Sequence, residues 1–304
     1  MFDLEQTLKS ILVSENAYLR MNEPMARHTT FRIGGPAGAF VSPGNEEELS
    51  AVLRLCRGRG LPYTVLGNGS NLLVSDKGYD GVVIAMEDGF AWRRTEGSCL
   101  IAGAGELLSR AASLALERSL TGFEFAAGIP GTVGGALVMN AGAYGSEIKD
   151  VLAWARVMTE EGRVLTLSGE ELELGYRTSC IPSRHYIVLE AAFRLLPGEK
   201  DAIVSRMKEL AARRREKQPL EYPSAGSTFK RPEGYFAGKL IEDAGLKGCR
   251  VGGAQVSEKH CGFVINRDNA TAADVIGLCN HIKERVKAMS GVELEMEVKK
   301  LGEF

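Results

Sequence analysis

The chain has 304 residues, 44% of them hydrophobic and 25% charged, with a formal net charge of −2. This length predicts about two globular domains, and a nearly neutral chain lacks the broad basic face that nucleic acid requires. The start, MFDLE, carries acid where a signal peptide carries base, and no apolar run approaches membrane-spanning length. We therefore expect a cytoplasmic protein with no membrane insertion.

Cysteine and histidine usage argues against metal chemistry. The six cysteines include no Cys-x-x-Cys, and the four histidines include no His-Glu-x-x-His. Scattered cysteines of this kind are typical of reduced thiols in a cytosol rather than of disulfides or a zinc site. We expect no bound metal.

The first half of the chain is predicted to contain both helices and short strands. Apolar spacing predicts a helix over residues 3–13, followed by a strand near 38–42. Asn45, with Glu48 three residues later, marks the start of a second helix, which ends at Gly58 or Gly60. Further elements are predicted from short apolar runs as strands at 62–66, 82–86 and 99–103, and as a helix at 106–118.

The second half continues with a predicted hairpin over 151–167 that turns at Glu161-Gly162, a strand at 186–196 and a long helix at 199–217. We place a domain boundary near the end of that helix. Beyond it we expect a helix at 235–244, strands at 250–256 and 262–266, a helix at 272–289 with a Thr271–Asp274 capping box, and a half-buried strand at 292–301. Mixed elements in two blocks favour α+β architecture over a doubly wound sheet.

The densest glycine run is Gly122–Gly145, where seven of twenty-four residues are glycine and five are alanine. Glycine contributes no side chain to a core, so a run of this density indicates close approach of the backbone to another group. Bare N–H groups and the absence of positive charge predict a loop that wraps a phosphate-bearing cofactor through main-chain donors. The alternative is a tightly packed crossing of small residues.

A shorter glycine loop, Gly67–Asn71, comes first along the chain and follows the predicted strand 62–66 directly. A strand that runs into Gly-x-Gly with small polar residues can present several N–H groups to a pyrophosphate. The chain contains neither G-x-G-x-x-G nor a Walker A loop, which excludes the usual nicotinamide and P-loop motifs. The alternative is an Asn-Gly-type turn that joins two strands.

Three further segments carry side chains suited to chemistry. Ser227-x-x-Lys230 matches the Ser-x-x-Lys of acyl-transfer enzymes, but the Lys-Thr-Gly companion is absent. Arg177 could bind a carboxylate through its fork of donors or pair with a nearby glutamate. Glu297 shares one face of the last predicted strand with Glu293 and Glu295, and the alternation alone does not distinguish it from a solvated acid.

Taken together, these motifs resemble the UDP-N-acetylenolpyruvoylglucosamine reductase family of flavoenzymes. The similarity runs from Thr29 to Gly302, and the motifs that carry it are FRIGG (31–35), LGNGSN (66–71), GIPGTVGG (128–135), NAGAYG (140–145), YRTS (176–179), AGSTFK (225–230) and EMEV (295–298). The glycine loops alone would indicate only the wider group of vanillyl-alcohol-oxidase-like FAD domains.

The resemblance implies a two-lobed FAD-binding domain over residues 1–215, with the lobes split near 75–80. A substrate-binding domain would follow over 216–304, with its last strand returning to the active site. NADPH would reduce a non-covalently held FAD, and hydride would then pass to the vinyl carbon of UDP-N-acetylglucosamine enolpyruvate. The product, UDP-N-acetylmuramate, is a peptidoglycan precursor.

By the same resemblance, Arg177 and Glu297 would stabilise the enolate and Ser227 would deliver the proton. Because a carboxylate would repel the enolate, we expect a raised pKa for Glu297. Tyr176, Lys217 and Lys230 would bind the sugar nucleotide. FAD would be bound by the two glycine loops, at Gly67, Asn68, Gly69, Ser70, Asn71, Gly128, Ile129, Gly131, Thr132, Gly134 and Gly135.

The chain departs from the family pattern at Arg231, where asparagine is frequent, so no amide contact is transferred to that position. The segment 178–185 is too short for the tyrosine-bearing loop of the longer subclass, which places the chain in the shorter one. Two alternatives remain: another FAD oxidoreductase of the same fold, which the 225–230 and 295–298 motifs disfavour, and a non-catalytic sugar-nucleotide-binding protein. We expect a monomer.

Overall fold

The computed structural model describes residues 2–304, which form two compact units. Unit 1 comprises the residues up to Met21 together with Ala39–Asn68 and Gly81–Arg213. Unit 2 comprises Asn22–Gly38, Gly69–Asp80 and Arg214–Phe304. One of the points at which the chain passes from unit 1 to unit 2 lies between Asn68 and Gly69, inside the first glycine loop.

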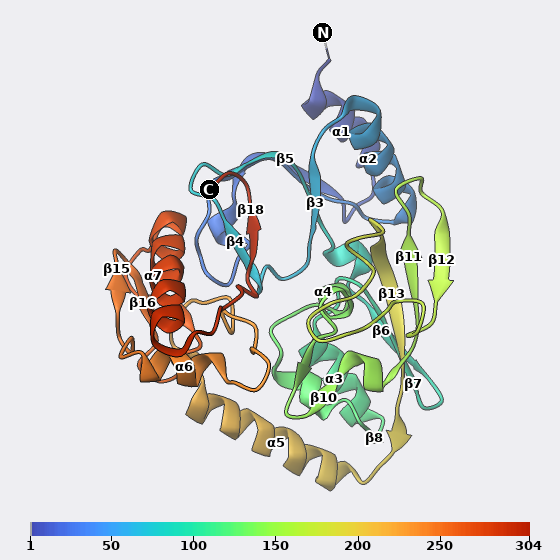
Figure 1. Ribbon diagram of the computed structural model, residues 1–304. Helices are drawn as coiled ribbons and strands as arrows, with labels where there is room; N and C mark the ends of the chain where they lie inside the picture. Colours follow the sequence, from blue (N-terminus) through green and yellow to red (C-terminus); the bar gives the residue numbers. More distant parts are fainter. Residues whose placement is uncertain (1) are drawn as a thin grey trace. The chain divides into compact units, whose positions relative to one another are not determined.

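Helices and strands are interspersed along the chain (Figure 1). The α-helices are α1 (Leu4–Ile11), α2 (Glu46–Arg59), α3 (Leu108–Glu117), α4 (Val133–Val138), α5 (Lys200–Lys217), α6 (Ala237–Asp243) and α7 (Ala272–Ser290). Short 3-10 helices are η1 (Met25–Arg27), η2 (Asp88–Phe90), η3 (Glu124–Gly128) and η4 (Ile148–Asp150). No helix within residues 2–304 is long and apolar enough to cross a membrane.

The strands are mostly short. In unit 1 or shared between the units they are β1 (Tyr18–Pro24), β2 (Pro36–Ser42), β3 (Tyr63–Leu66), β5 (Tyr79–Ala85), β6 (Arg93–Glu96), β7 (Cys99–Gly103), β8 (Leu120–Thr121), β9 (Gly142–Ala143), β10 (Ser146–Glu147), β11 (Leu152–Met158), β12 (Val164–Leu167), β13 (Ile187–Arg194) and β14 (Leu196–Pro197). In unit 2 they are β4 (Leu72–Val74), β15 (Arg250–Val251), β16 (Ala254–Val256), β17 (Val264–Asn266) and β18 (Lys299–Leu301).

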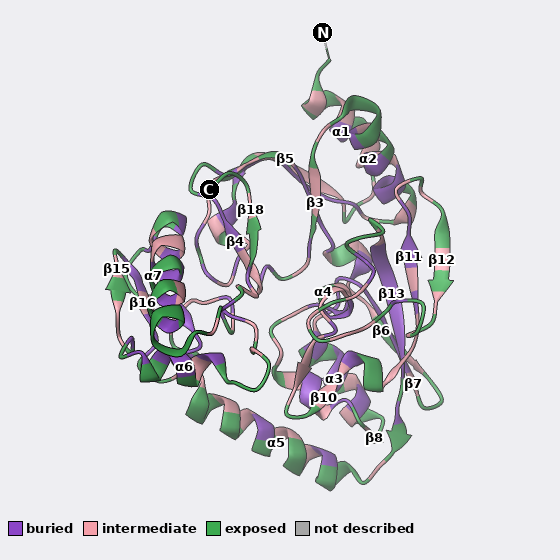
Figure 2. Cartoon of the chain, in the orientation of Figure 1, coloured by how far each residue is buried: buried purple, intermediate pink, exposed green. Residues whose placement is uncertain are grey.

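Unit 1 is built on a five-stranded sheet of order β12-β11-β13-β7-β6, in which all neighbours are antiparallel. The central strand β13 is buried along its first seven residues (Figure 2). Helix α4 contacts β13 and β7, and α3 contacts β6 and β7. A second sheet has the order β1-β2-β5-β3, and in it β3 and β5 pair parallel.

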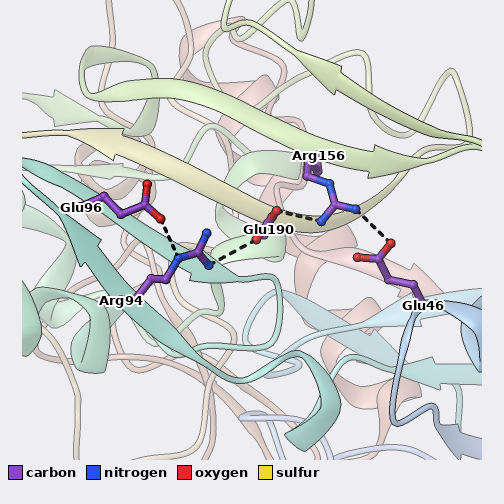
Figure 3. A network of polar contacts seen from close by, with 5 residues as sticks. All are labelled: Glu46, Arg94, Glu96, Arg156 and Glu190. Carbon is purple, nitrogen blue, oxygen red and sulfur yellow. Dashed lines mark hydrogen bonds and ion pairs between the residues drawn. The ribbon is translucent and has the colours of Figure 1, made fainter.

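A charged network lies across the unit 1 sheet (Figure 3). Glu190 on β13 is nearly buried, and its carboxylate pairs with Arg156 at 2.8 Å and with Arg94 at 3.9 Å. Arg156 also reaches Glu46 at the start of α2, at 3.1 Å, and Arg94 reaches Glu96 at 3.0 Å. The hydrogen bond with Glu190 raises the pKa of Arg156. The network compensates a buried charge and ties α2 to the sheet.

Unit 2 combines the antiparallel sheet β15-β16-β17 with α6 and α7, and α7 packs against β15, β16 and α6. Its fully buried core side chains include Phe31, Leu73, Ile241, Val256, Val275 and Ile282. The last strand, β18, pairs parallel with β4, from Lys299 beside Leu72 to Leu301 beside Val74. The end of the chain is therefore held against the segment that follows the first glycine loop.

Helix ends predicted from local signals are confirmed. The Asn45 side chain accepts a hydrogen bond from the N–H of Glu48, and Gly60 ends α2 in the left-handed conformation. Thr271 and Asp274 form a complete capping box, and Gly291 ends α7 with φ 72°. The hairpin of β11 and β12 is also confirmed.

Three predictions about local structure are wrong. Residues 250–256 form two strands, β15 and β16, because Gly252 (φ +52°) and Gly253 turn the chain there. Residues 292–301 are a strand only at Lys299–Leu301, since the preceding residues pair singly with a loop and form no ladder. The glycine-rich run is also not one continuous loop, because Thr132 caps the short helix α4 inside it.

Candidate functional site

The first glycine loop connects β3 to β4, which lie in different sheets, so it is not the turn of a hairpin. A Cβ on Gly67 would lie 2.3 Å from the Thr132 hydroxyl oxygen. Gly69 has φ +58°, and its Cβ would lie 2.0 Å from the carbonyl oxygen of His28. Contacts with protein atoms therefore already require glycine at both positions.

The same loop leaves donors available for a ligand. Within the described residues 2–304, the backbone N–H groups of Gly67, Asn68, Gly69, Ser70 and Asn71 donate to no protein acceptor. Unpaired backbone N–H groups are costly unless water or a ligand binds them. Consecutive donors on a glycine loop suit phosphate oxygens, so this segment fits the diphosphate of a dinucleotide.

The second glycine loop, residues 128–135, contacts Gly67 and Asn68 of the first loop within unit 1. The Asn68 amide donates to the carbonyl oxygen of Pro130 at 2.9 Å, and Thr132 lies against Gly67. Over the part of the chain that is described, the N–H groups of Gly131 and Thr132 also lack a protein acceptor. Gly67 and Asn68 of the first loop and Gly131 and Thr132 of the second thus contribute donors within unit 1, whereas Gly69, Ser70 and Asn71 belong to unit 2.

The remaining predicted positions of the second loop differ among themselves. A Cβ on Gly134 would lie 3.1 Å from the Ala104 Cβ, so the small-residue packing alternative explains that glycine. Gly135 donates to the Thr132 hydroxyl at 3.4 Å as part of the α4 cap. Gly128 ends η3, and the N–H of Ile129 is bonded to Ala126.

Arg177 lies in a tight turn of unit 1. The backbones of Gly175 and Thr178 exchange hydrogen bonds of 3.1 and 3.3 Å, and Arg177 between them has φ +54°. Its guanidinium donates to the Gly142 carbonyl at 3.4 Å and lies 5.2 Å from the centre of the Tyr176 ring. The exposed Tyr176 therefore helps to hold the arginine.

Asn140 anchors this turn, and sequence reasoning gave it no role. It is fully buried, and its amide donates to the Gly175 carbonyl and to the Glu147 carboxylate, both at 3.0 Å. Its own carbonyl oxygen accepts from the N–H of Lys149 at 2.9 Å. Its sequence signals were its place at the start of the NAGAYG motif and inside a glycine-rich run, where an asparagine tolerates left-handed backbone.

In unit 2, two segments distant in sequence bring Ser227 and Glu297 together. The N–H of Glu297 donates to the carbonyl of Thr228 at 2.9 Å, and Phe229 and Met296 form a bridge. Thr228 is 1% exposed, and its hydroxyl accepts from the N–H of Val264 at 2.8 Å. The residue next to Ser227 is thus fixed on both sides, while Ser227 itself is exposed.

Glu297 differs from the acids that share its face. Glu293 and Glu295 are exposed, whereas Glu297 is partly buried. Lys230 pairs with Glu295 at 2.5 Å, and this hydrogen bond lowers the pKa of Glu295. The alternative that these acids are solvent-exposed side chains without a special role therefore fits Glu293 and Glu295 but not Glu297.

Lys217 ends α5 in unit 2 and is exposed. Its charge contributes to the lowered pKa of His260, for which burial is the main cause. Cys180 follows the Arg177 turn, and its pKa is raised by burial, which argues against a reactive thiolate.

One cavity of unit 2 is lined by none of the predicted site residues. It measures about 520 Å³ and is lined in part by Arg32, Asp76 and Arg267. Both carboxylate oxygens of Asp76 accept from the first N–H groups of α7, at 2.7 and 3.0 Å.

The predicted site residues fall into two groups, one in each unit. Unit 1 holds the glycine-loop residues up to Asn68, residues 128–135 and the Arg177 turn, and unit 2 holds Gly69–Asn71, Lys217, Ser227, Lys230 and Glu297.

Comparison with known proteins identifies the family. Residues 218–301 match the C-terminal domain of UDP-N-acetylenolpyruvoylglucosamine reductase, and residues 37–168 match an FAD binding domain. The UDP-N-acetylenolpyruvoylglucosamine reductase of Lachnoclostridium phytofermentans is 54% identical over 302 residues, which are 98% of this chain and 97% of that protein. The chain belongs to the UDP-N-acetylenolpyruvoylglucosamine reductase family.

Solved structures agree with this family. The UDP-N-acetylenolpyruvylglucosamine reductase of Thermus caldophilus has a TM-score of 0.80 at 36% identity and covers 94% of this chain and 99% of its own. The grass pollen allergen Phl p 4, which has glucose dehydrogenase activity, has a TM-score of 0.51 at 12% identity over 65% of this chain and 45% of its own, and shows the fold alone. The family, the α+β architecture and the FAD-binding domain predicted from the motifs are confirmed.

Proposed function

We propose that this chain reduces UDP-N-acetylglucosamine enolpyruvate to UDP-N-acetylmuramate with NADPH and FAD, as a step of peptidoglycan precursor synthesis. The observation that carries the proposal is 54% identity over 98% of the chain to a reductase of that name. When bound, FAD carries two electrons from NADPH to the substrate. Hydride adds to one carbon of the enolpyruvyl double bond and a proton to the other, which leaves NADP⁺ and a lactyl ether.

FAD is held without a covalent bond by the two glycine loops. Backbone N–H groups of Gly67–Asn71, Gly131 and Thr132, which have no protein acceptor within residues 2–304, bind its diphosphate. Residues 1–215 form the FAD-binding domain, with lobes split near 75–80, and residues 216–304 form the substrate-binding domain. The resemblance of the motifs supports this division.

Arg177 supplies the charge that the reaction needs. Hydride addition leaves an enolate beside a carboxylate, and a fork of guanidinium donors stabilises this charge most in the transition state. Removal of one preorganised donor of this kind costs about 2.7–4 kcal/mol of barrier. Its left-handed backbone, held by the Gly175–Thr178 turn, supports such preorganisation.

Ser227 delivers the proton and Glu297 assists on the enolate. Their segments are joined through the Thr228–Glu297 hydrogen bond of 2.9 Å, which supports a shared role. A positioned proton donor is worth about 10²–10⁴-fold in rate. Lys217, Lys230 and Tyr176 bind the sugar nucleotide. The Lys230–Glu295 pair is exposed on its acidic side, so exchanging the partner for a phosphate costs little.

The protein works in the cytoplasm as a monomer, and its product serves cell-wall biogenesis and hence cell shape, the cell cycle and division. Its partners are NADPH and a sugar nucleotide, with neither nucleic acid nor a membrane among them. The charge of −2 supports the exclusion of nucleic acid.

The visible absorption spectrum of the purified protein tests the function. We expect a yellow protein that bleaches with NADPH under anaerobic conditions and recolours on addition of UDP-N-acetylglucosamine enolpyruvate. Recolouring only with oxygen or another acceptor would keep the fold and refute the substrate. A colourless protein that FAD cannot reconstitute would refute the interpretation of both loops.

Replacing Ser227 by alanine tests the assignment of the proton donor. Ser227→Ala should bleach normally with NADPH but recolour about 10²–10⁴-fold more slowly, because only the second half-reaction needs the proton. Ser224→Ala, in the same loop, is the matched control, since Ser224 contributes its backbone carbonyl to Thr30. Normal turnover in Ser227→Ala would remove serine from the mechanism.

A further inference from the structure

Asn71 links the first glycine loop to the segment that carries Glu297. Its side-chain amide donates to the backbone carbonyl of Glu297 at 3.3 Å, and its backbone carbonyl accepts from the N–H of Lys299 at 3.0 Å. The parallel pairing of β4 and β18 begins directly after it, at Leu72 and Lys299. All of these residues belong to unit 2.

Glu297 is held from its other side as well. Its N–H donates to the carbonyl of Thr228 at 2.9 Å, and Thr228 is buried beside Ser227. The two backbone polar groups of Glu297 are therefore both bound, one by the neighbour of Ser227 and one by Asn71. The residues just before β18 form no ladder, so these single hydrogen bonds fix the main chain from which the carboxyl group projects.

We propose that Asn71 is a positioning residue for Glu297. Its amide holds the glutamate backbone, and its contribution to the cofactor is limited to its backbone N–H. This inference rests on the proposed function, in which Glu297 acts on the enolate. It also refines the prediction that Asn71 is a cofactor-binding residue, because the amide that could have contacted the cofactor is already used within the protein.

The residues of the first glycine loop therefore have two different roles. Gly67–Ser70 present N–H groups without a protein acceptor in the described chain, whereas the last loop residue turns its side chain to the catalytic segment. Loss of the amide should leave the diphosphate donors in place and loosen Glu297. A misplacement of about 1 Å costs on the order of 10²-fold in rate.

The test compares Asn71→Ala with Gln255→Ala. Gln255 also donates its side-chain amide to a backbone carbonyl of unit 2, that of Gly248 at 3.2 Å, and neither residue is among the proposed site residues. Three measurements are made on each protein: FAD affinity from flavin fluorescence, hydrogen exchange of residues 294–301 in the cofactor-free protein, and the rates of the two half-reactions.

For Asn71→Ala we expect FAD affinity within about threefold of the parent, faster exchange of residues 297–301, and a substrate half-reaction about 10- to 100-fold slower with normal bleaching by NADPH. Gln255→Ala should change none of these. Asn71→Asp, which keeps the size and loses the donor, should reproduce the result, and it replaces the alanine variant if that variant does not fold.

Unchanged exchange over 297–301, or an unchanged substrate half-reaction, overturns the proposal. A large loss of FAD affinity with unchanged exchange also overturns it, because Asn71 would then be a cofactor ligand. If the enolpyruvyl substrate does not reoxidise the reduced flavin of the parent protein, the proposed function is wrong. Hydrogen exchange of residues 297–301 would still decide whether Asn71 holds the segment that carries Glu297.

Discussion

Substitution of Asn140 tests how unit 1 positions Arg177. Asn140 is fully buried, donates at 3.0 Å to both Gly175 and Glu147, and accepts at 2.9 Å from Lys149. Asn140→Ala removes three hydrogen bonds at about 1 kcal/mol each and leaves the N–H of Lys149 without its acceptor, while Gly175 and Glu147 keep their bonds to Thr178 and Lys149. We expect the free energy of unfolding to fall by about 3 kcal/mol.

Asn140→Asp gives the same loss a pH signature. The new carboxylate would face the Glu147 carboxylate and the Gly175 carbonyl, so its folded pKa would be raised above its unfolded value. The folded state then binds more protons than the unfolded state, and stability should increase as the pH falls from 7 towards 5. Asn140→Ala should show no such recovery relative to the parent.

Both variants should also slow the substrate half-reaction, because the Gly175–Thr178 turn presents Arg177. We expect a loss of about 10²-fold with normal bleaching by NADPH. Urea unfolding and anaerobic stopped-flow absorbance measure the two effects. The control is Asn45→Ala, which removes two side-chain hydrogen bonds, of 2.9 and 2.7 Å, from the cap of α2 in the same unit. Equal loss of stability with an unchanged half-reaction would show that Asn140 is structural only.

Two further predictions concern stability. Thr228→Val should lower the free energy of unfolding by about 1–3 kcal/mol, because the N–H of Val264 loses its acceptor in a buried site. Thr228→Ser keeps the hydroxyl acceptor and should keep most of the parent's free energy of unfolding. Equal losses of stability in the two variants, measured by urea unfolding, would contradict this explanation. Burial alone would raise the pKa of Glu48, but hydrogen bonds from Gly44, Ser14 and Val13 outweigh it and lower the pKa below its ordinary 4.5. This stabilisation is present above pH 4.5 and is lost as the pH falls through the lower folded pKa, so the stability gap between the parent and Glu48→Gln should narrow in acid; a constant gap would refute it.

The sequence predicted best what short-range physics decides. Caps at Asn45 and Thr271 and the stop at Gly291 depend on residues within one helical turn, so the ends of α2 and α7 followed from local signals. The glycine loops were located for a similar reason, although contacts with Thr132 and His28 account for two of their glycines.

Long-range pairing was not predictable in the same way. The alternation of apolar and charged residues over 292–301 correctly predicted a face with buried side chains, which include Leu294 and Val298. It also predicted a continuous strand, whereas only Lys299–Leu301 form one. The segment changes partner, from the Thr228 loop to β4, and neither partner leaves a mark in the local pattern. For the same reason the roles of Asn71 and Asn140 could not be inferred from their positions in the sequence.

The two proposed catalytic segments share one structural solution. Arg177 lies in left-handed backbone and Glu297 in a stretch without a ladder, so neither helix nor sheet fixes them. Such backbone persists only where its surroundings over-determine it. In each case an asparagine amide supplies a hydrogen bond to the irregular main chain, from Asn140 to Gly175 and from Asn71 to Glu297. Because these bonds fix geometry on irregular backbone, their loss should slow the half-reaction with the enolpyruvyl substrate while leaving reduction by NADPH intact.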